Sequence, residues 1–222
     1  MQSQRLTLSP ENPVLASPLL PALFAGLVVS TPEQGSQNNT DHHRLKILDV
    51  GPALPETLKF FSQTRSRLYF ADLFEEQLQL TYISLSQNSE QDSEQGAVNA
   101  DFPTLRAYPS EERFDLCLFW DFLNYLNPER LLAFSAALQP FIHRDTRAHA
   151  FTTQSTKTPI TNLSYGIESY ELLSERLRKD PALELHTHSL AELKRYLPCL
   201  SVTRSRLLTD GRLEVLMDAH GA

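Results

Sequence analysis

The segment from Arg113 to Asp121 (RFDLCLFWD) restricts the fold more than any other part of the chain. It is apolar almost without interruption, and strands of this kind are usually buried on both faces in the interior of a parallel sheet. A helix pattern follows at about 129–139, where apolar residues recur near helical spacing. Together, the two segments predict an α/β fold with a central parallel strand.

An earlier strand signal ends in a glycine turn. Residues Lys46 to Thr57 read KILDVGPALPET, in which the apolar run 47–50 is followed by Gly51 and then by Pro55, a residue suited to the first position of a helix. Open α/β sheets usually hold a nucleotide-like ligand at such a strand–glycine–helix junction. We expect Gly51 to adopt a positive φ and to expose backbone N–H groups to an anionic group.

A second strand is expected over 67–73, and near its end stands Asp72, which follows Gly51 by 21 positions. In nucleotide sites, a carboxylate about 20 residues beyond the glycine turn accepts hydrogen bonds from ribose hydroxyls. The alternative is that Asp72 caps the helix expected from Phe74 onward. The sequence leaves both interpretations open.

The N-terminal region, residues 1–43, is expected to be an extension of a main domain at 44–222. Within it, the apolar segment 17–29 predicts a helix with Ser17 as its N-cap, which docks on the domain or, as an alternative, binds a protein partner. This segment is shorter than the roughly 20 apolar residues that span a bilayer, so no membrane span is expected. The polar run 31–43 predicts a surface linker.

The C-terminal part predicts a hairpin. A helix pattern at about 188–197 is followed by two β-rich runs, 200–208 and 213–217, with Asp210-Gly211 between them. Asp-Gly in this position is a strong hairpin signal. The insert 152–180 follows the strand expected at about 149–152, and it predicts a lid or a wall of a substrate pocket. The alternative for its apolar residues, Tyr170 and Leu173 among them, is plain helix packing.

Composition limits the partners and the compartment. The 222 residues are 41% hydrophobic, which is enough for one globular domain with a sizeable core, and the net charge of −7 argues against a general nucleic-acid binder. Cys117 and Cys199 lie in apolar surroundings without metal or redox spacing, which favours structural thiols and a reducing, cytoplasmic location. No metal site is expected.

Taken together, these features resemble the class I S-adenosylmethionine-dependent methyltransferase superfamily. The resemblance covers roughly 45–218 and rests on ILDVG at 47–51, on Asp72, on the segment FDLCLFWDFLNYLNPERLLAFSAALQPFI at 114–142 and on the terminal hairpin signal. It implies a Rossmann-like, doubly wound α/β fold, with a mostly parallel seven-stranded sheet and a C-terminal antiparallel β-hairpin. It also implies S-adenosylmethionine as the cofactor.

The resemblance further implies which residues form the site. The glycine turn would contact the methionine part of the cofactor, Asp72 the ribose, and the loop after the central strand the reacting end. The implied cofactor contacts are Asp49, Gly51, Ala53, Asp72, Asp101, Phe102, Phe119, Trp120 and Asp121. The candidate substrate contacts are Asn124, Tyr125 and Tyr165. No catalytic residue is implied, because methyl transfer depends mainly on positioning and in-line approach.

The glycine turn departs from the pattern of the superfamily. Ala53 and Pro55 stand where the second and third glycines would be, and Pro52 removes one backbone N–H. The leading hypothesis is a methyltransferase acting on an unidentified small-molecule or protein acceptor. The altered turn keeps an alternative open, a catalytically inactive methyltransferase-like fold that serves as a protein-interaction or scaffolding module. A nicotinamide-dependent enzyme is disfavoured by the terminal hairpin.

Overall fold

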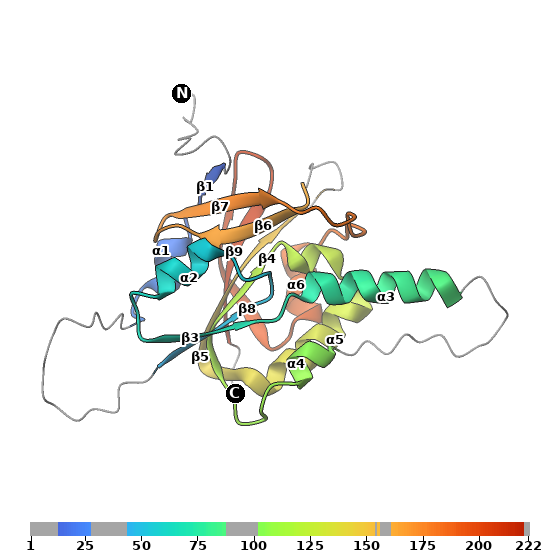
Figure 1. Ribbon diagram of the computed structural model, residues 1–222, viewed down its shortest axis with the longest axis horizontal. Helices are drawn as coiled ribbons and strands as arrows, with labels where there is room; N and C mark the ends of the chain where they lie inside the picture. Colours follow the sequence, from blue (N-terminus) through green and yellow to red (C-terminus); the bar gives the residue numbers. More distant parts are fainter. Residues whose placement is uncertain (1–12, 28–43, 88–101, 154, 156–160, 220–222) are drawn as a thin grey trace, which may run out of the picture.

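The computed structural model describes residues 13–27, 44–87, 102–153, 155 and 161–219, with side chains except at 82–87. Figure 1 shows the elements with the labels used below. In chain order they are β1 (Val14–Ala16), α1 (Leu20–Phe24), β2 (Leu45–Asp49), α2 (Pro55–Phe61), β3 (Ser66–Phe70), α3 (Leu73–Gln87), α4 (Pro103–Arg106), β4 (Phe114–Trp120), η1 (Phe122–Tyr125), α5 (Pro128–Leu138), η2 (Gln139–Phe141), β5 (Ile142–Thr152), β6 (Leu163–Ile167), β7 (Leu172–Leu177), α6 (Leu190–Tyr196), β8 (Leu200–Leu207) and β9 (Leu213–Ala219).

The larger sheet has the strand order β3-β2-β4-β5-β9-β8. The first four of these strands are parallel to one another, whereas β9 pairs antiparallel with both β5 and β8. The fold is therefore a mixed α/β fold with a mostly parallel sheet. The described residues give this sheet six strands, where the sequence analysis predicts seven; the segment 88–101 between α3 and α4 lies outside the described residues.

Strand β4 is the centre of the molecule, and all seven of its residues are buried. This confirms the prediction of a central strand covered on both faces. Its side chains alternate between two apolar clusters: Cys117 and Phe119 face one that also contains residues of α4, α5 and α6, whereas Leu118 and Trp120 face one built with α1, α2 and the β6–β7 strands. β5 begins at Ile142, earlier than the expected 149, and its register against β4 shifts between Phe114 and Leu116.

The insert 152–180 contains a β-hairpin, so the alternative of helix packing is wrong. β6 and β7 pair antiparallel, and β1 adds to the other edge of β7, which gives a second sheet in the order β1-β7-β6. Figure 1 shows this hairpin (orange) beside α1 and α2. The local apolar spacing around Tyr170 resembles a helix, but the strands bury Leu173 and Ile167 against the core shared with β2 and β4. Tertiary packing decides the outcome here.

Close packing of β6 on α2 leads to a prediction for Gly166. A methyl group at this position would lie 2.7 Å from Ser174 Oγ and 3.1 Å from the Cβ of Glu56 in α2. Gly166→Ala is therefore expected to lower the free energy of unfolding by about 1–2 kcal/mol, the usual cost of overpacking. Urea unfolding followed by circular dichroism measures this, and the double variant Gly166→Ala/Ser174→Ala should recover part of the loss. An unchanged midpoint for Gly166→Ala would contradict this packing.

The N-terminal helix is shorter than predicted and starts differently. α1 covers Leu20–Phe24, its N-cap position is Leu19 without a side-chain cap, and Gly26 follows its end with a φ of 77°. The predicted helix 17–29 is therefore wrong at both ends: it starts three residues later, at Leu20, and it ends before Gly26. A glycine in the left-handed conformation ends a helix, which explains the early end. Leu20 and Leu23 are fully buried in the core that they share with β2 and β4.

A buried carboxylate on β9 holds the start of α1. Glu214 is completely buried and accepts hydrogen bonds from Ser17 Oγ and from the backbone N–H of Leu19 (3.3 Å). The same carboxylate lies 2.9 Å from Nε2 of His149, which is also completely buried. Ser17 thus bonds to a strand far away in the sequence instead of capping its own helix.

Candidate functional site

The carboxyl ends of three parallel strands bring three aspartates to one edge of the sheet. Asp49 is the last residue of β2, Asp72 comes just after β3, and Asp121 directly follows β4. The N–H of Ala71 donates to the backbone oxygen of Asp49 (2.9 Å), which holds the turns after β2 and β3 side by side. β3 lies on one side of β2 and β4 on the other, so this edge contains the point where the strand order reverses.

Asp49 is buried, with 1% of its surface exposed. Its Oδ1 accepts hydrogen bonds from the indole Nε1 of Trp120 (2.7 Å) and from the backbone N–H of Gly51 (2.9 Å), whereas Oδ2 is buried without a partner. Burial raises the pKa of Asp49 to about 7, although the bonds from Trp120 and Gly51 act in the opposite direction. Asp49 therefore titrates near neutral pH.

Gly51 does not have the positive φ that the sequence analysis predicts. Its N–H is used by Asp49, and a methyl group at this position would lie 3.2 Å from Asp49 Oδ1 and 3.3 Å from Cδ1 of Trp120. Glycine is thus needed here for the close approach of the indole and not for a left-handed turn. The non-glycine residues with positive φ among those described are Asp72 (30°) and Trp120 (52°). Ala53 lies exposed in the loop before α2.

Asp72 is half-buried and caps α3, which is one of the two roles that the sequence left open. Its carboxylate accepts a hydrogen bond from the backbone N–H of Glu75 in the first turn of α3, as a helix cap does. Its Oδ1 is nevertheless buried without a partner. Burial raises the pKa of Asp72, against the opposing effect of the positive charge of Arg178. One acceptor oxygen therefore remains for a ligand.

Asp121 is completely buried. Its Oδ2 accepts a hydrogen bond from the hydroxyl of Tyr125 (3.1 Å), and its Oδ1 is buried without a partner. Burial raises the pKa of Asp121 to about 6, while the charge of Arg178 lowers it. Burial, together with the neighbouring Asp121, also holds the pKa of Tyr125 far above its usual value, so this hydroxyl stays a donor.

Asn124 is engaged within the chain. Its Nδ2 donates to the backbone oxygens of Asp121 (3.0 Å) and Phe151 (2.9 Å), and its Oδ1 accepts from the N–H of Thr153 (3.0 Å). Both amide hydrogens are thereby used to tie η1 to the end of β5. Asn124 positions the loop after β4, and its role as a substrate contact stays a prediction.

The predicted aromatic contacts are divided between the two faces of the sheet. Trp120 stacks on Tyr165 of β6, with ring centres 5.6 Å apart and an angle of 18°. Phe119 points to the opposite face, where its ring meets Phe134 of α5. Phe102 also packs on Phe134, and the guanidinium of Arg130 lies 4.9 Å from its centre. The structure therefore brings Trp120 and Tyr165 together but not Phe119, and Asp101 lies outside the described residues.

Two arginines at this edge were not predicted from the sequence. Arg212 precedes β9, and its Nη1 donates to the hydroxyl of Tyr165 (2.7 Å), while Nη2 contacts Glu175 (2.8 Å) and Asp210 (2.6 Å). Arg178 follows β7, and its charge acts on Asp49, Asp72 and Asp121. No local motif marks either residue, because both reach the edge only through tertiary packing.

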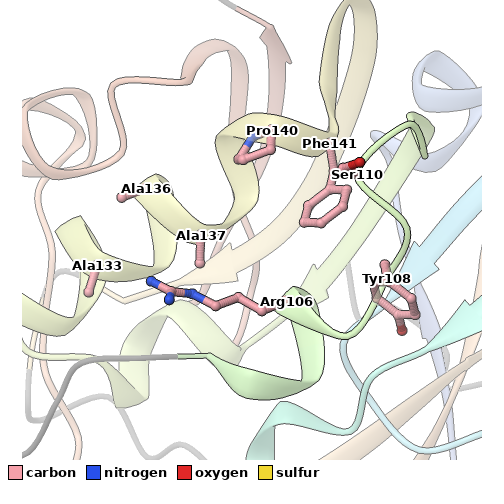
Figure 2. Close-up of a pocket in the computed structure, with 8 residues that line it drawn as sticks. All are labelled: Arg106, Tyr108, Ser110, Ala133, Ala136, Ala137, Pro140 and Phe141. Carbon is pink, nitrogen blue, oxygen red and sulfur yellow. The ribbon is translucent and has the colours of Figure 1, made fainter.

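The pocket drawn in Figure 2 lies elsewhere. It has a volume of about 540 Å³ and is lined by Arg106, Tyr108, Ser110, Ala133, Ala136, Ala137, Pro140 and Phe141. These residues surround the amino-terminal ends of β4 and β5, so the pocket is at the opposite end of the strands from Asp49 and Asp121. Figure 2 shows the Arg106 side chain extending along α5 past Ala137 toward Ala133. The predicted site residues do not line it.

No group of three or more His, Cys, Asp or Glu side chains among the described residues is arranged to hold a metal ion. None of the described helices combines the length and the apolar character needed to cross a membrane.

Comparisons with known proteins give likeness in structure only. No protein-family model matches the chain, and no curated protein sequence does. Similar solved structures include an S-adenosylmethionine-dependent methyltransferase from Clostridium acetobutylicum, with 13% identity, a TM-score of 0.42 and coverage of 81% of this chain and 85% of that one. The 1,6-didemethyltoxoflavin-N1-methyltransferase of Burkholderia thailandensis has 11% identity and a TM-score of 0.46, over 99% and 100% of the two chains.

A third similar structure is the pyocyanin biosynthetic protein PhzM, with 14% identity and a TM-score of 0.42. The match covers 82% of this chain but spans only about half, 52%, of PhzM.

Proposed function

We propose that this protein is an S-adenosylmethionine-dependent methyltransferase that acts on a small-molecule or protein acceptor. One observation carries the proposal: at the carboxyl ends of three neighbouring parallel strands, Asp49, Asp72 and Asp121 each keep a buried carboxylate oxygen without a partner. A buried acceptor of this kind costs free energy unless a donor reaches it. Ligands of open α/β sheets bind at this edge, where the strand order reverses.

The residues fit the donor groups of the cofactor. A ribose presents two hydroxyl donors, and Oδ1 of Asp72 is an acceptor at the end of the second parallel strand in the chain. At the glycine turn the Gly51 N–H already donates to Asp49, so a contact from that N–H to the cofactor is not part of the proposal. We assign the ribose to Asp72, and we place Asp49 and Asp121 beside the reacting end.

The protein itself orients the acceptor and excludes water from the site. Bound S-adenosylmethionine supplies an electrophilic methyl group, and transfer depends mainly on holding the acceptor in line with it. Trp120 and Tyr165 form a stacked apolar wall near Asp49, and both are almost completely buried. The hydroxyl of Tyr125 donates a hydrogen bond to Asp121. These aromatic rings exclude water from the edge and orient an acceptor there.

Replacing Asp72 tests the assignment of the ribose. Asp72→Ala is expected to weaken the binding of S-adenosylmethionine and of S-adenosylhomocysteine by about 1–3 kcal/mol, because hydrogen bonds to a charged acceptor are lost. Calorimetric titration of the purified chain measures both ligands. Asp145→Ala is the control, since its side chain is 73% exposed at the start of β5, and it should leave both affinities unchanged.

Two results of that titration would argue against the proposal. Affinity for neither ligand in the unaltered chain would remove the enzyme hypothesis and leave the scaffolding alternative. Binding that Asp72→Ala does not weaken would retain the cofactor but place its ribose elsewhere.

A further inference from the structure

Arg178 lies between the start of β6 and α3. Its backbone N–H donates to the oxygen of Asn162 (2.9 Å), and its Nε donates to the oxygen of Leu163 (2.9 Å) at the start of β6. Its guanidinium carbon lies 3.5 Å from the centre of the Phe74 ring, in α3. That ring in turn packs against Tyr125, which bonds to Asp121. The arginine therefore bridges the second sheet and the ends of the parallel strands.

The carboxyl groups around Arg178 outnumber the cations there. Its positive charge acts on the carboxyl groups of Asp49, Asp72 and Asp121. The other titratable groups that face this cluster are Tyr125, Asp180, Glu75 and Arg212. Arg212 is already paired with Glu175 and Asp210. Three carboxyl groups with unpartnered oxygens thus share mainly one cation.

A ligand that carries a positive charge would meet both attraction and repulsion here. The carboxylates attract it, whereas Arg178 repels it, and charges several ångströms apart in a partly buried site influence each other strongly. The methyl donor has a cationic sulfonium, while the product that remains after transfer has an uncharged thioether. The two ligands differ in charge by one unit at the reacting end and are otherwise nearly identical.

We propose that Arg178 is a specificity-determining residue that serves as the counter-cation of Asp49, Asp72 and Asp121. Its charge weakens the preference of this edge for the methyl donor, which has a cationic sulfonium, over the product, which has an uncharged thioether. This inference rests on the proposed function. It predicts that removing the arginine charge tightens the binding of the donor and leaves the binding of the product nearly unchanged.

The test compares Arg178→Met with the unaltered chain in calorimetric titrations with S-adenosylmethionine and with S-adenosylhomocysteine. The dissociation constant for S-adenosylmethionine is expected to fall by about tenfold, and that for S-adenosylhomocysteine to change by less than about twofold. Arg204→Met is the matched control, since it removes the same charge from an exposed position on β8. It should leave the ratio of the two constants unchanged.

The failures of the two proposals are distinguishable. If neither the unaltered chain nor Arg178→Met binds either ligand, the proposed function fails and this inference with it. If the unaltered chain binds both and Arg178→Met changes both constants equally, only the inference fails. A loss of both affinities would show that Arg178 holds the cofactor directly, which also overturns its role as a competing cation.

Unfolding of the ligand-free protein gives an independent readout. Without Arg178 the carboxylates lose their counter-cation, so the melting temperature of Arg178→Met should fall more at pH 8, where Asp49 and Asp121 are ionised, than at pH 5.5. Arg204→Met should show no such difference. A decrease in melting temperature that is the same at both pH values would mean that Arg178 contributes packing only, and would overturn the proposal.

Discussion

Glu214→Ala is expected to lower the free energy of unfolding by about 3–5 kcal/mol, because it removes one partner from a completely buried polar cluster. The carboxylate is completely buried, and it is the acceptor for Ser17 Oγ and the N–H of Leu19, as well as the partner of His149 Nε2. Its removal leaves these donors in the interior without an acceptor, and such groups are costly. Urea unfolding monitored by circular dichroism at pH 7 measures the loss.

The controls separate this cluster from general damage to β9. Asp218→Ala removes an exposed carboxylate from the same strand and should change stability by less than about 0.5 kcal/mol. Glu214→Gln keeps an acceptor in place and should recover part of the loss. Hydrogen exchange should show that the N–H of Leu19 loses protection in the alanine variant. A loss of less than 1 kcal/mol would mean that α1 is held mainly by its leucines.

Asp49→Asn is expected to change how stability depends on pH. Burial raises the folded-state pKa of Asp49 to about 7, above its value in the unfolded chain, so the folded protein binds the extra proton between these two values. The stability that the protonated Asp49 gives the folded protein is fully present at low pH and is lost as pH rises toward 7. Relative to Asp49→Asn, the unaltered protein should therefore lose about 3 kcal/mol of stability between pH 4.5 and pH 7.

Unfolding free energies measured at half-unit steps of pH test this prediction. An asparagine still accepts from Trp120 and Gly51 but does not titrate, so the difference between the two proteins isolates the carboxyl group. Asp121→Asn should show the same sign, with the change complete near pH 6. Asp145→Asn, at an exposed position, should show none. A difference that stays flat with pH for Asp49→Asn would contradict a raised pKa.

The sequence predicted those parts of the fold whose signals are local. The run 114–120 is apolar except for Asp115 and is buried on both faces, and α5 follows it because Leu131, Phe134 and Leu138 recur at helical spacing. The β6–β7 hairpin was not predicted, because its strands are fixed by pairing with one another and with β1, more than 150 residues earlier in the chain. Long-range pairing leaves little trace in a short window of sequence.

The same division holds for the candidate site. Asp49, Asp72 and Asp121 could be found because the ends of strands can be read locally. Arg178 could not, since nothing near it in the sequence indicates that the hairpin returns it to Phe74. The conformation of the turn was also predicted wrongly: Gly51 does not have a positive φ, and the positive φ values at this edge belong to Asp72 and Trp120.

The stacking of Trp120 on Tyr165 has a practical consequence. Trp120 is the only tryptophan in the 222 residues, and its indole nitrogen is bonded to the carboxylate that titrates near pH 7. The tryptophan fluorescence of the protein, excited selectively, therefore comes from a single ring at the end of β4. We therefore expect the emission of this ring to change when Asp49 titrates or when a ligand reaches this edge, without any attached label.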